Sequence, residues 1–121
     1  MVTRENLIDK YALISVFNKN KLNLLCSTLK NFKYKFIATE STCNKIKQLG
    51  FECFEVSEIT KFNQILGGRV KTLNPKIFGS ILYDRRSDIH TKEFKKLNIP
   101  RIDLVVINLY PFEKFSNKND F

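Results

Sequence analysis

Short apolar runs alternate with amphipathic stretches along this chain. Residues 11–16 (YALISV) and 34–38 (YKFIA) have the length and apolar character of buried strands, and residues 51–56 predict a third, weaker strand. Residues 102–109 (IDLVVINL) give the strongest strand signal, because they are largely apolar and rich in β-branched side chains. A strand of this kind is typical of a central position in a parallel sheet, with both faces covered.

Helical spacing of apolar residues separates these runs. Three segments predict helices, namely residues 19–30, residues 43–49 and residues 87–98, the last capped by Ser87 or Asp88. Asn18 is a suitable N-cap for the first helix, and Gly50 is the usual residue just past the end of the second. Residues 39–42 predict a turn, and Asn74 followed by Pro75 predicts a further helix start.

This order of elements predicts an α/β fold in a single domain spanning residues 1–121. Strands that alternate with helices form β-α-β units, which build a parallel sheet flanked by helices. In open parallel sheets, ligands bind at the carboxyl ends of the strands. We therefore expect a binding site in the turns after residues 16, 38 and 109, together with the long loop around residue 69.

The net charge of +9 on 121 residues fits either a polyanion binder or a general bias toward lysine. The lysines are spread along the whole chain and no RNA-binding signature accompanies them, which argues against a nucleic-acid partner. A small phosphorylated ligand would also benefit from this charge.

Three features of the sequence argue against other classes of protein: the spacing of the cysteines, the single histidine and the length of the apolar runs. The 3 cysteines include no C-x-x-C pair, which favours a reducing, cytoplasmic setting over a disulfide framework. One histidine, His90, argues against a zinc site. No apolar run reaches the length of a membrane span, and the N-terminus lacks the apolar core of a signal peptide. We expect a cytoplasmic protein with neither a metal site nor a membrane partner.

One stretch, residues 67–82 (GGRVKTLNPKIFGSIL), gathers glycine and positive charge. It holds 3 of the chain's 4 glycines together with Arg69 and Lys71, and no acidic residue occurs from residue 61 to residue 82. Hydroxyl, amide and cationic side chains also follow the predicted strands: Ser15 and Lys19, Thr39 and Thr42, Thr72 in the loop, and Asn108. Singly these are typical of helix caps or solvated lysines, whereas together they predict a pocket for an anionic small molecule.

The motifs resemble a known family. The loop GGRVKTLNPK is similar to G-G-R-V-K-T-L-H-P-K of the IMP cyclohydrolase domain, the N-terminal part of a bifunctional purine-biosynthesis enzyme that also carries AICAR transformylase. Residues 12–22 (ALISVFNKNKL) resemble that family's A-L-I-S-V-S-D-K-T-G-L, and residues 102–112 (IDLVVINLYPF) resemble I-D-L-V-V-V-N-L-Y-P-F. The resemblance covers residues 12–115 in the right order and spacing.

The resemblance implies a methylglyoxal-synthase-like fold with a Rossmann-like three-layer arrangement. It implies closure of the purine ring, in which formyl-AICAR loses water and becomes IMP without a cofactor. Lys71 and Tyr110 match catalytic positions. Substrate-binding positions match Ser15, Lys19, Thr39 and Thr42 around the phosphate, and Arg69, Thr72 and Asn108 along the rest of the nucleotide. Dimers are usual in the family, so a homodimer is a further expectation.

Two departures from the family pattern bear on activity. Glu40 and Ser41 replace both glycines of the family's S-T-G-G-T turn, so that Glu40 either faces a bound phosphate or lies in a first helical turn, where acidic residues are favoured. The chain also stops before the family's I-D-I-G-G and A-A-K-N motifs, and the transformylase part is absent. We therefore expect a truncated domain with little turnover and an uncovered edge or apolar face at its last strand. A non-catalytic, purine-nucleotide-binding or regulatory domain is the alternative.

Overall fold

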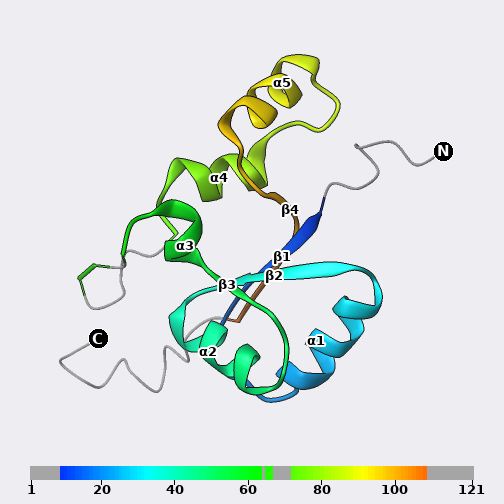
Figure 1. Ribbon diagram of the computed structural model, residues 1–121, viewed down its shortest axis with the longest axis vertical. Helices are drawn as coiled ribbons and strands as arrows, with labels where there is room; N and C mark the ends of the chain where they lie inside the picture. The colour runs from blue at the N-terminus through cyan, green and yellow to red at the C-terminus, as the bar shows by residue number, and fades with distance from the viewer. Residues whose placement is uncertain (1–8, 64, 67–71, 109–121) are drawn as a thin grey trace.

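A parallel sheet of four strands forms the centre of the protein, whose computed structural model describes residues 9–63, 65–66 and 72–108. The strands are β1 (Lys10–Val16), β2 (Tyr34–Ala38), β3 (Phe54–Glu55) and β4 (Arg101–Asn108), and they lie in the order β3-β2-β1-β4 (Figure 1). Every described pairing is parallel. The predicted α/β class with a parallel sheet is therefore confirmed.

Helices cover both faces of this sheet and make three layers (Figure 1). Helices α1 (Leu22–Asn31) and α2 (Glu40–Gln48) enclose a core with the side chains that alternate along one face of β1, among them Ala12 and Ile14. On the other face, Leu13 packs with side chains of α3 (Val56–Thr60) and α4 (Pro75–Leu82). Helix α5 (Asp88–Leu97) lies farther from the sheet. None of the helices in the described ranges is long and apolar enough to cross a membrane.

Several local predictions are confirmed by the helix caps. Asn74 precedes Pro75 and its side chain accepts a hydrogen bond from the Lys76 backbone N–H at 2.9 Å, which starts α4 as predicted. Ser87 caps α5 in the same way. Gly50 follows α2 with a φ of 95°, a conformation that glycine adopts without strain.

Two predicted helix starts are wrong. Helix α2 begins at Glu40 rather than at residue 43, because the Cys43 backbone N–H already reaches the Thr39 carbonyl at 2.7 Å, so residues 40–42 form the first turn of the helix instead of the predicted turn before it. Asn18 does not cap α1, which begins only at Leu22. The Asn18 side chain instead accepts from the Asn20 backbone N–H and tightens the turn before the helix.

The strand predicted over residues 51–56 is also wrong in extent. Only Phe54–Glu55 pairs with β2, and Val56 begins α3, a short helix that the sequence pattern did not predict. Cys53 and Val56 are both buried but belong to the two different cores.

Strand β4 lies at the edge of the described sheet, which corrects the predicted central position. Its described neighbour is β1 alone. Val105 and Ile107 are 39% and 57% exposed, so the predicted apolar face beside this strand is confirmed. An apolar, β-branched run predicts a strand well, but it does not identify what covers the strand.

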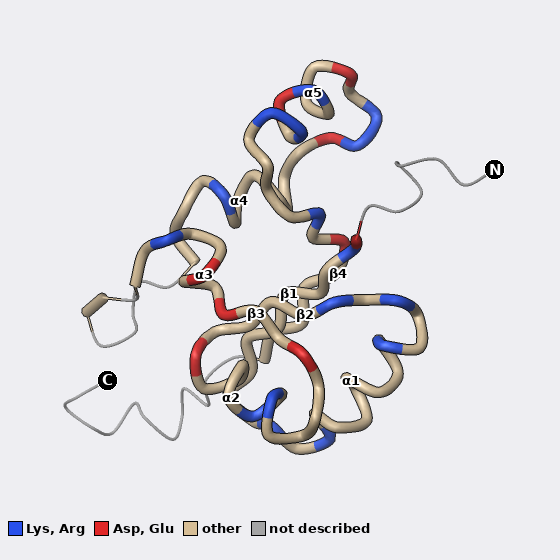
Figure 2. The backbone as a smooth tube through the Cα atoms, viewed as in Figure 1, with Lys and Arg blue, Asp and Glu red and all other residues tan. Residues whose placement is uncertain are grey.

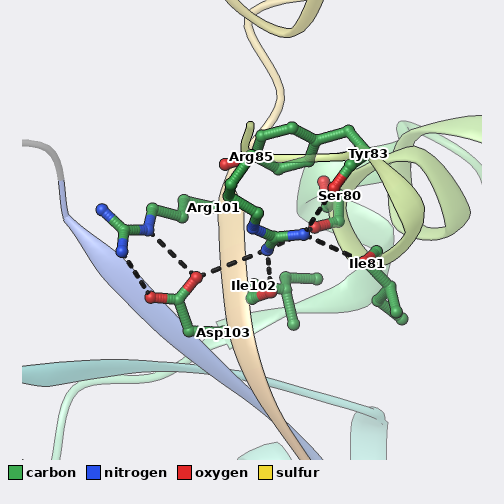
Figure 3. Close-up of polar contacts among 7 residues, drawn as sticks. All are labelled: Ser80, Ile81, Tyr83, Arg85, Arg101, Ile102 and Asp103. Atoms are coloured by element: carbon green, nitrogen blue, oxygen red, sulfur yellow. Dashed lines mark hydrogen bonds and ion pairs between the residues drawn. The ribbon is translucent and has the colours of Figure 1, made fainter. Parts of the chain in front are cut away.

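A β-bulge in β4 is held in place by Arg85, which follows α4 (Figure 3). The pairing steps from Tyr11–Ile102 to Ala12–Leu104, so Asp103 is the extra residue. The Arg85 guanidinium donates to the carbonyl of Ile102 and to the Asp103 carboxylate at 3.3 Å. It also donates to three carbonyls at the end of α4, those of Ser80, Ile81 and Tyr83. Arg85 thus ties the end of α4 to the point where β4 changes register.

Candidate functional site

Three strands end side by side at one edge of the sheet. Strand β2 ends at Ala38, which pairs with Ile14 of β1. Strand β4 ends at Asn108, which pairs with Val16, the last residue of β1. Because all three strands are parallel, their carboxyl ends meet at this edge, as predicted for a binding site. Several of the predicted binding residues come together here.

Two hydroxyls meet beside the N-terminus of α2, one from Thr39 just before the helix and one from Ser15 of β1. Thr39, the residue before the helix, has an extended backbone, and its side chain makes no capping hydrogen bond. Its hydroxyl instead donates to the Ser15 hydroxyl at 3.4 Å. A helix N-terminus whose cap side chain points elsewhere presents backbone N–H groups and the positive end of the helix dipole, an arrangement that favours an anion.

Glu40 occupies the first turn of α2 and is exposed. Its carboxylate therefore has the location that the helix dipole favours, which is one of the two readings open from the sequence. The same carboxylate adds negative charge at the edge where an anionic ligand would bind.

Thr42 lies wholly inside this region, with 0% of its surface exposed. Its hydroxyl donates to the Val16 carbonyl at 3.3 Å and accepts from the Val16 backbone N–H at 3.4 Å. The side chain thus joins the first turn of α2 to the end of β1. The hydrogen bonds of this hydroxyl are directed at protein backbone.

Asn108 joins β4 to the turn between β1 and α1. Its Oδ1 accepts from the backbone N–H groups of Phe17 and Asn18 at 2.6 and 3.2 Å, and its Nδ2 donates to the Asn18 carbonyl at 3.0 Å. Lys19, in the same turn, is half-buried and donates from Nζ to the Val16 carbonyl at 2.9 Å. The turn is therefore held by the side chain of Asn108 from the end of β4 and by its own Lys19.

The loop before α4 is described only in part. Thr72 is half-buried, and its carbonyl accepts from the Asn74 backbone N–H at 2.8 Å just before the helix. Arg69 and Lys71 lie outside the described residues, as does Tyr110. Their predicted roles remain predictions.

The distribution of charged residues bears on the kind of ligand that the protein could bind. Figure 2 shows lysines and arginines distributed over many elements of the described chain, interspersed with acidic residues, which does not resemble a concentrated nucleic-acid face.

Burial raises the pKa of Cys26 to about 11 and also raises the pKa of Cys43 and Cys53. Buried thiols that stay protonated are poor nucleophiles, so these cysteines do not suggest covalent catalysis. The described ranges contain no group of three or more potential ligands that could hold a metal ion.

Comparison with known proteins assigns the family. The profile of the MGS-like domain matches residues 21–120. The chain belongs to the MGS-like domain family. This MGS-like domain is 48% identical over 103 residues to the bifunctional purine biosynthesis protein PurH of Clostridium acetobutylicum, a match that covers 85% of this chain and 21% of the relative. It is 40% identical over 117 residues to PurH of Elusimicrobium minutum, covering 97% of this chain and 22% of the relative.

A solved structure supports the same assignment. The crystal structure of ForH matches this MGS-like domain with a TM-score of 0.73 and 33% identity, covering 84% of this chain and 51% of the other. The domain spans about a fifth of the length of its PurH relatives. The similarity to PurH extends over nearly the whole chain, so it includes β1 and the turn that Asn108 holds.

Sequence reasoning found the residues of this edge but missed how they bond to one another. The contacts of Thr42 and Asn108 reach 26 and about 90 residues back along the chain. Neither contact has a local sequence signal. Asn18, predicted as a helix cap, is instead a partner of Asn108 through its backbone.

Proposed function

We propose that this MGS-like domain binds a purine nucleotide monophosphate and acts in IMP cyclohydrolysis, the closure of formyl-AICAR to IMP in purine biosynthesis. The observation that carries the proposal is the hydroxyl pair of Ser15 and Thr39 at the N-terminus of α2, in a chain 40–48% identical to PurH proteins. A phosphate suits this place, because backbone N–H groups and hydroxyls can donate to its oxygens.

In this proposal the nucleotide lies along the carboxyl edge of the sheet. Its phosphate binds near Ser15 and Thr39, with Lys19 contributing positive charge. Arg69 and Thr72 contact the nucleotide from the loop before α4. The base lies toward the end of β4, beside Asn108 and Tyr110. These assignments rest on the family motifs and on the shared edge of β1, β2 and β4.

The proposed chemistry needs proton transfer rather than a cofactor. The carboxamide nitrogen of formyl-AICAR attacks the formyl carbon, a C–N bond forms, and the formyl oxygen leaves as water after taking up protons. As the nitrogen attacks the formyl carbon, the formyl oxygen gains negative charge in the transition state, which a nearby cation stabilises. We assign this stabilisation to Lys71, and proton transfer to Tyr110 and Lys71.

A second function has a specific observation in its favour. Glu40 is exposed in the first turn of α2, where the family pattern has glycine. A carboxylate at this position weakens phosphate binding by repulsion. A domain that binds a purine nucleotide weakly, as a regulatory rather than a catalytic unit, would tolerate this substitution better than an enzyme.

Calorimetric titration with IMP tests the binding proposal. The wild-type chain should bind saturably, and Arg69→Ala should weaken binding by about ten-fold or more, since a lost charge-assisted hydrogen bond is worth roughly 1.5–3 kcal/mol. Lys92→Ala is the matched control, because it removes one positive charge from the exposed surface of α5. No binding by a chain that circular dichroism shows to be folded would overturn the proposal.

Turnover of formyl-AICAR separates the two functions. Formation of IMP that is lost in Lys71→Ala supports cyclohydrolysis with Lys71 at the reacting centre. IMP binding without any turnover supports the non-catalytic function. Turnover that persists at the wild-type rate in Lys71→Ala excludes Lys71 from the mechanism.

A further inference from the structure

The turn between β1 and α1, residues 17–21, is held from two sides by side chains of other elements. Thr42 reaches it from α2 and bonds both backbone groups of Val16, the last residue of β1. Asn108 reaches it from β4 and bonds the backbone of Phe17 and Asn18. Ser15 and Lys19 stand immediately before and within this clamped backbone.

The amide of Asn108 has almost no capacity left for a ligand. A side-chain carbonyl accepts two hydrogen bonds, and the Oδ1 of Asn108 already takes both, from Phe17 and Asn18. Its Nδ2 has two hydrogens, one of which is donated to the Asn18 carbonyl. The two backbone donors and one backbone acceptor also fix which way the amide is turned. Any contact with a ligand is therefore limited to one remaining N–H.

The β-bulge is what brings Asn108 to this turn. After the extra residue Asp103, the pairing continues in step and ends with Asn108 opposite Val16. Without the extra residue, Ile107 would pair with Val16. Asn108 would then stand one position farther along, with its side chain on the opposite face of the sheet. The register that follows the bulge therefore allows the Asn108 side chain to reach the turn.

We propose that Asn108 is a positioning residue that fixes the β1–α1 turn for the phosphate end of the ligand, with Thr42 as its counterpart on the other side. The identity of the ligand rests on the function proposed above. In this arrangement Asn108 acts on Ser15 and Lys19 through the backbone of the turn. The competing role, implied by the family resemblance, is direct contact with the purine base.

Two fragments of the nucleotide distinguish these roles. Ribose 5-phosphate carries the phosphate without the base, and inosine carries the base without the phosphate. In NMR titrations of the full chain, Asn108→Ala should weaken ribose 5-phosphate and IMP by about ten-fold, as expected for about 1.4 kcal/mol. Inosine should bind within about two-fold of its wild-type affinity. Asn31→Ala, which replaces an exposed asparagine at the end of α1, is the matched control.

Hydrogen exchange tests the clamp without any ligand. The amides of Phe17 and Asn18 should exchange at least about ten-fold faster in Asn108→Ala, since each loses its acceptor. Asn108→Asp keeps two acceptor lone pairs at the same place and should restore slow exchange. A structural loss elsewhere would not produce a change confined to these two amides and reversed by aspartate.

Other outcomes of these experiments would overturn either the positioning role of Asn108 or the proposed function. Equal weakening of inosine and ribose 5-phosphate, or unchanged exchange at Phe17 and Asn18, would overturn the positioning role. If the wild-type chain binds neither IMP nor ribose 5-phosphate, the proposed function fails. The exchange rates then support or overturn the clamp by themselves.

Discussion

Replacing Arg85 by lysine should destabilise the protein far more than its partly exposed position suggests. The Arg85 guanidinium bonds carbonyls at the end of α4, the Ile102 carbonyl and the Asp103 carboxylate, and its plane lies over the Tyr83 ring with Cζ 4.0 Å from the ring centre (Figure 3). Lysine keeps the charge but presents its three hydrogens from a single point. It cannot reach this set of acceptors together.

The size of the effect follows from the number of bonds. Nη1 donates to two carbonyls, and the two hydrogens of Nη2 are shared among three acceptors. This amounts to about four full bonds, each worth roughly 0.5–1.5 kcal/mol. Solvent screening of a side chain that is 36% exposed lowers this sum, and lysine recovers part of it. We expect a loss of about 2 kcal/mol in the free energy of unfolding.

Urea unfolding followed by circular dichroism measures this loss, and the neighbouring arginine supplies the control. Arg86 is 92% exposed at its side chain and has an ion pair of 3.4 Å with Asp84. Arg86→Lys should therefore change stability by no more than about 0.5 kcal/mol. If Arg85→Lys is as stable as wild type, or if Arg86→Lys loses as much stability as Arg85→Lys, the bonds of Arg85 do not stabilise the fold as proposed.

Three further predictions concern the site and the core. Glu40→Gln should raise the affinity for IMP by about five-fold, because it removes the repulsion between the carboxylate and the phosphate, and it should lower stability by roughly 0.3–1 kcal/mol, because it removes a negative charge from the N-terminus of α2. Glu93→Gln on α5 is the control, and an unchanged affinity of Glu40→Gln in a titration would contradict the prediction. Thr42→Val should cost about 1–2 kcal/mol in urea unfolding, whereas a cost below about 0.5 kcal/mol contradicts the bonds to Val16. Burial raises the pKa of Cys26 from 9.0 to about 11, so between pH 9 and pH 11 the unfolded chain ionises a thiol that the folded chain keeps protonated. The free energy of unfolding should therefore keep the full contribution of this thiol below pH 9 and fall as the pH rises from 9 to 11. Cys26→Ala should reduce the slope by about 1.4 kcal/mol per pH unit, and an identical slope argues against the shift.

Much of the fold follows from local pattern. The strands at residues 10–16 and 34–38 come from short apolar runs, and the helices after Asn74 and Ser87 come from cap residues whose side chains bond the backbone. These signals are local because each element is made by residues within a few positions of one another. The early start of α2 was missed because the bond from Cys43 to Thr39 favours a helix where the side chains suggested a turn.

The bonding within the site is a tertiary property. The motifs nominate Thr42 and Asn108, but their hydrogen bonds depend on strand order and on the bulge at Asp103. The apolar character of a strand does not reveal which strands lie beside it. For this reason β4 was predicted at the centre of the sheet, whereas it lies at the edge of the described sheet. Sequence pattern therefore identifies the residues of this edge better than it identifies what each one touches.

The most direct test of the central claim, that a purine nucleotide binds at the carboxyl edge of the sheet, is an NMR titration of the isotopically labelled chain with IMP. The largest shifts should fall on amides of residues 15–19 and 39–42, and those of α5 (Asp88–Leu97) should stay unchanged. If the largest shifts fall on α5 or around Lys30 at the end of α1, or if the folded chain shows no shifts at all, nucleotide binding at this edge is contradicted.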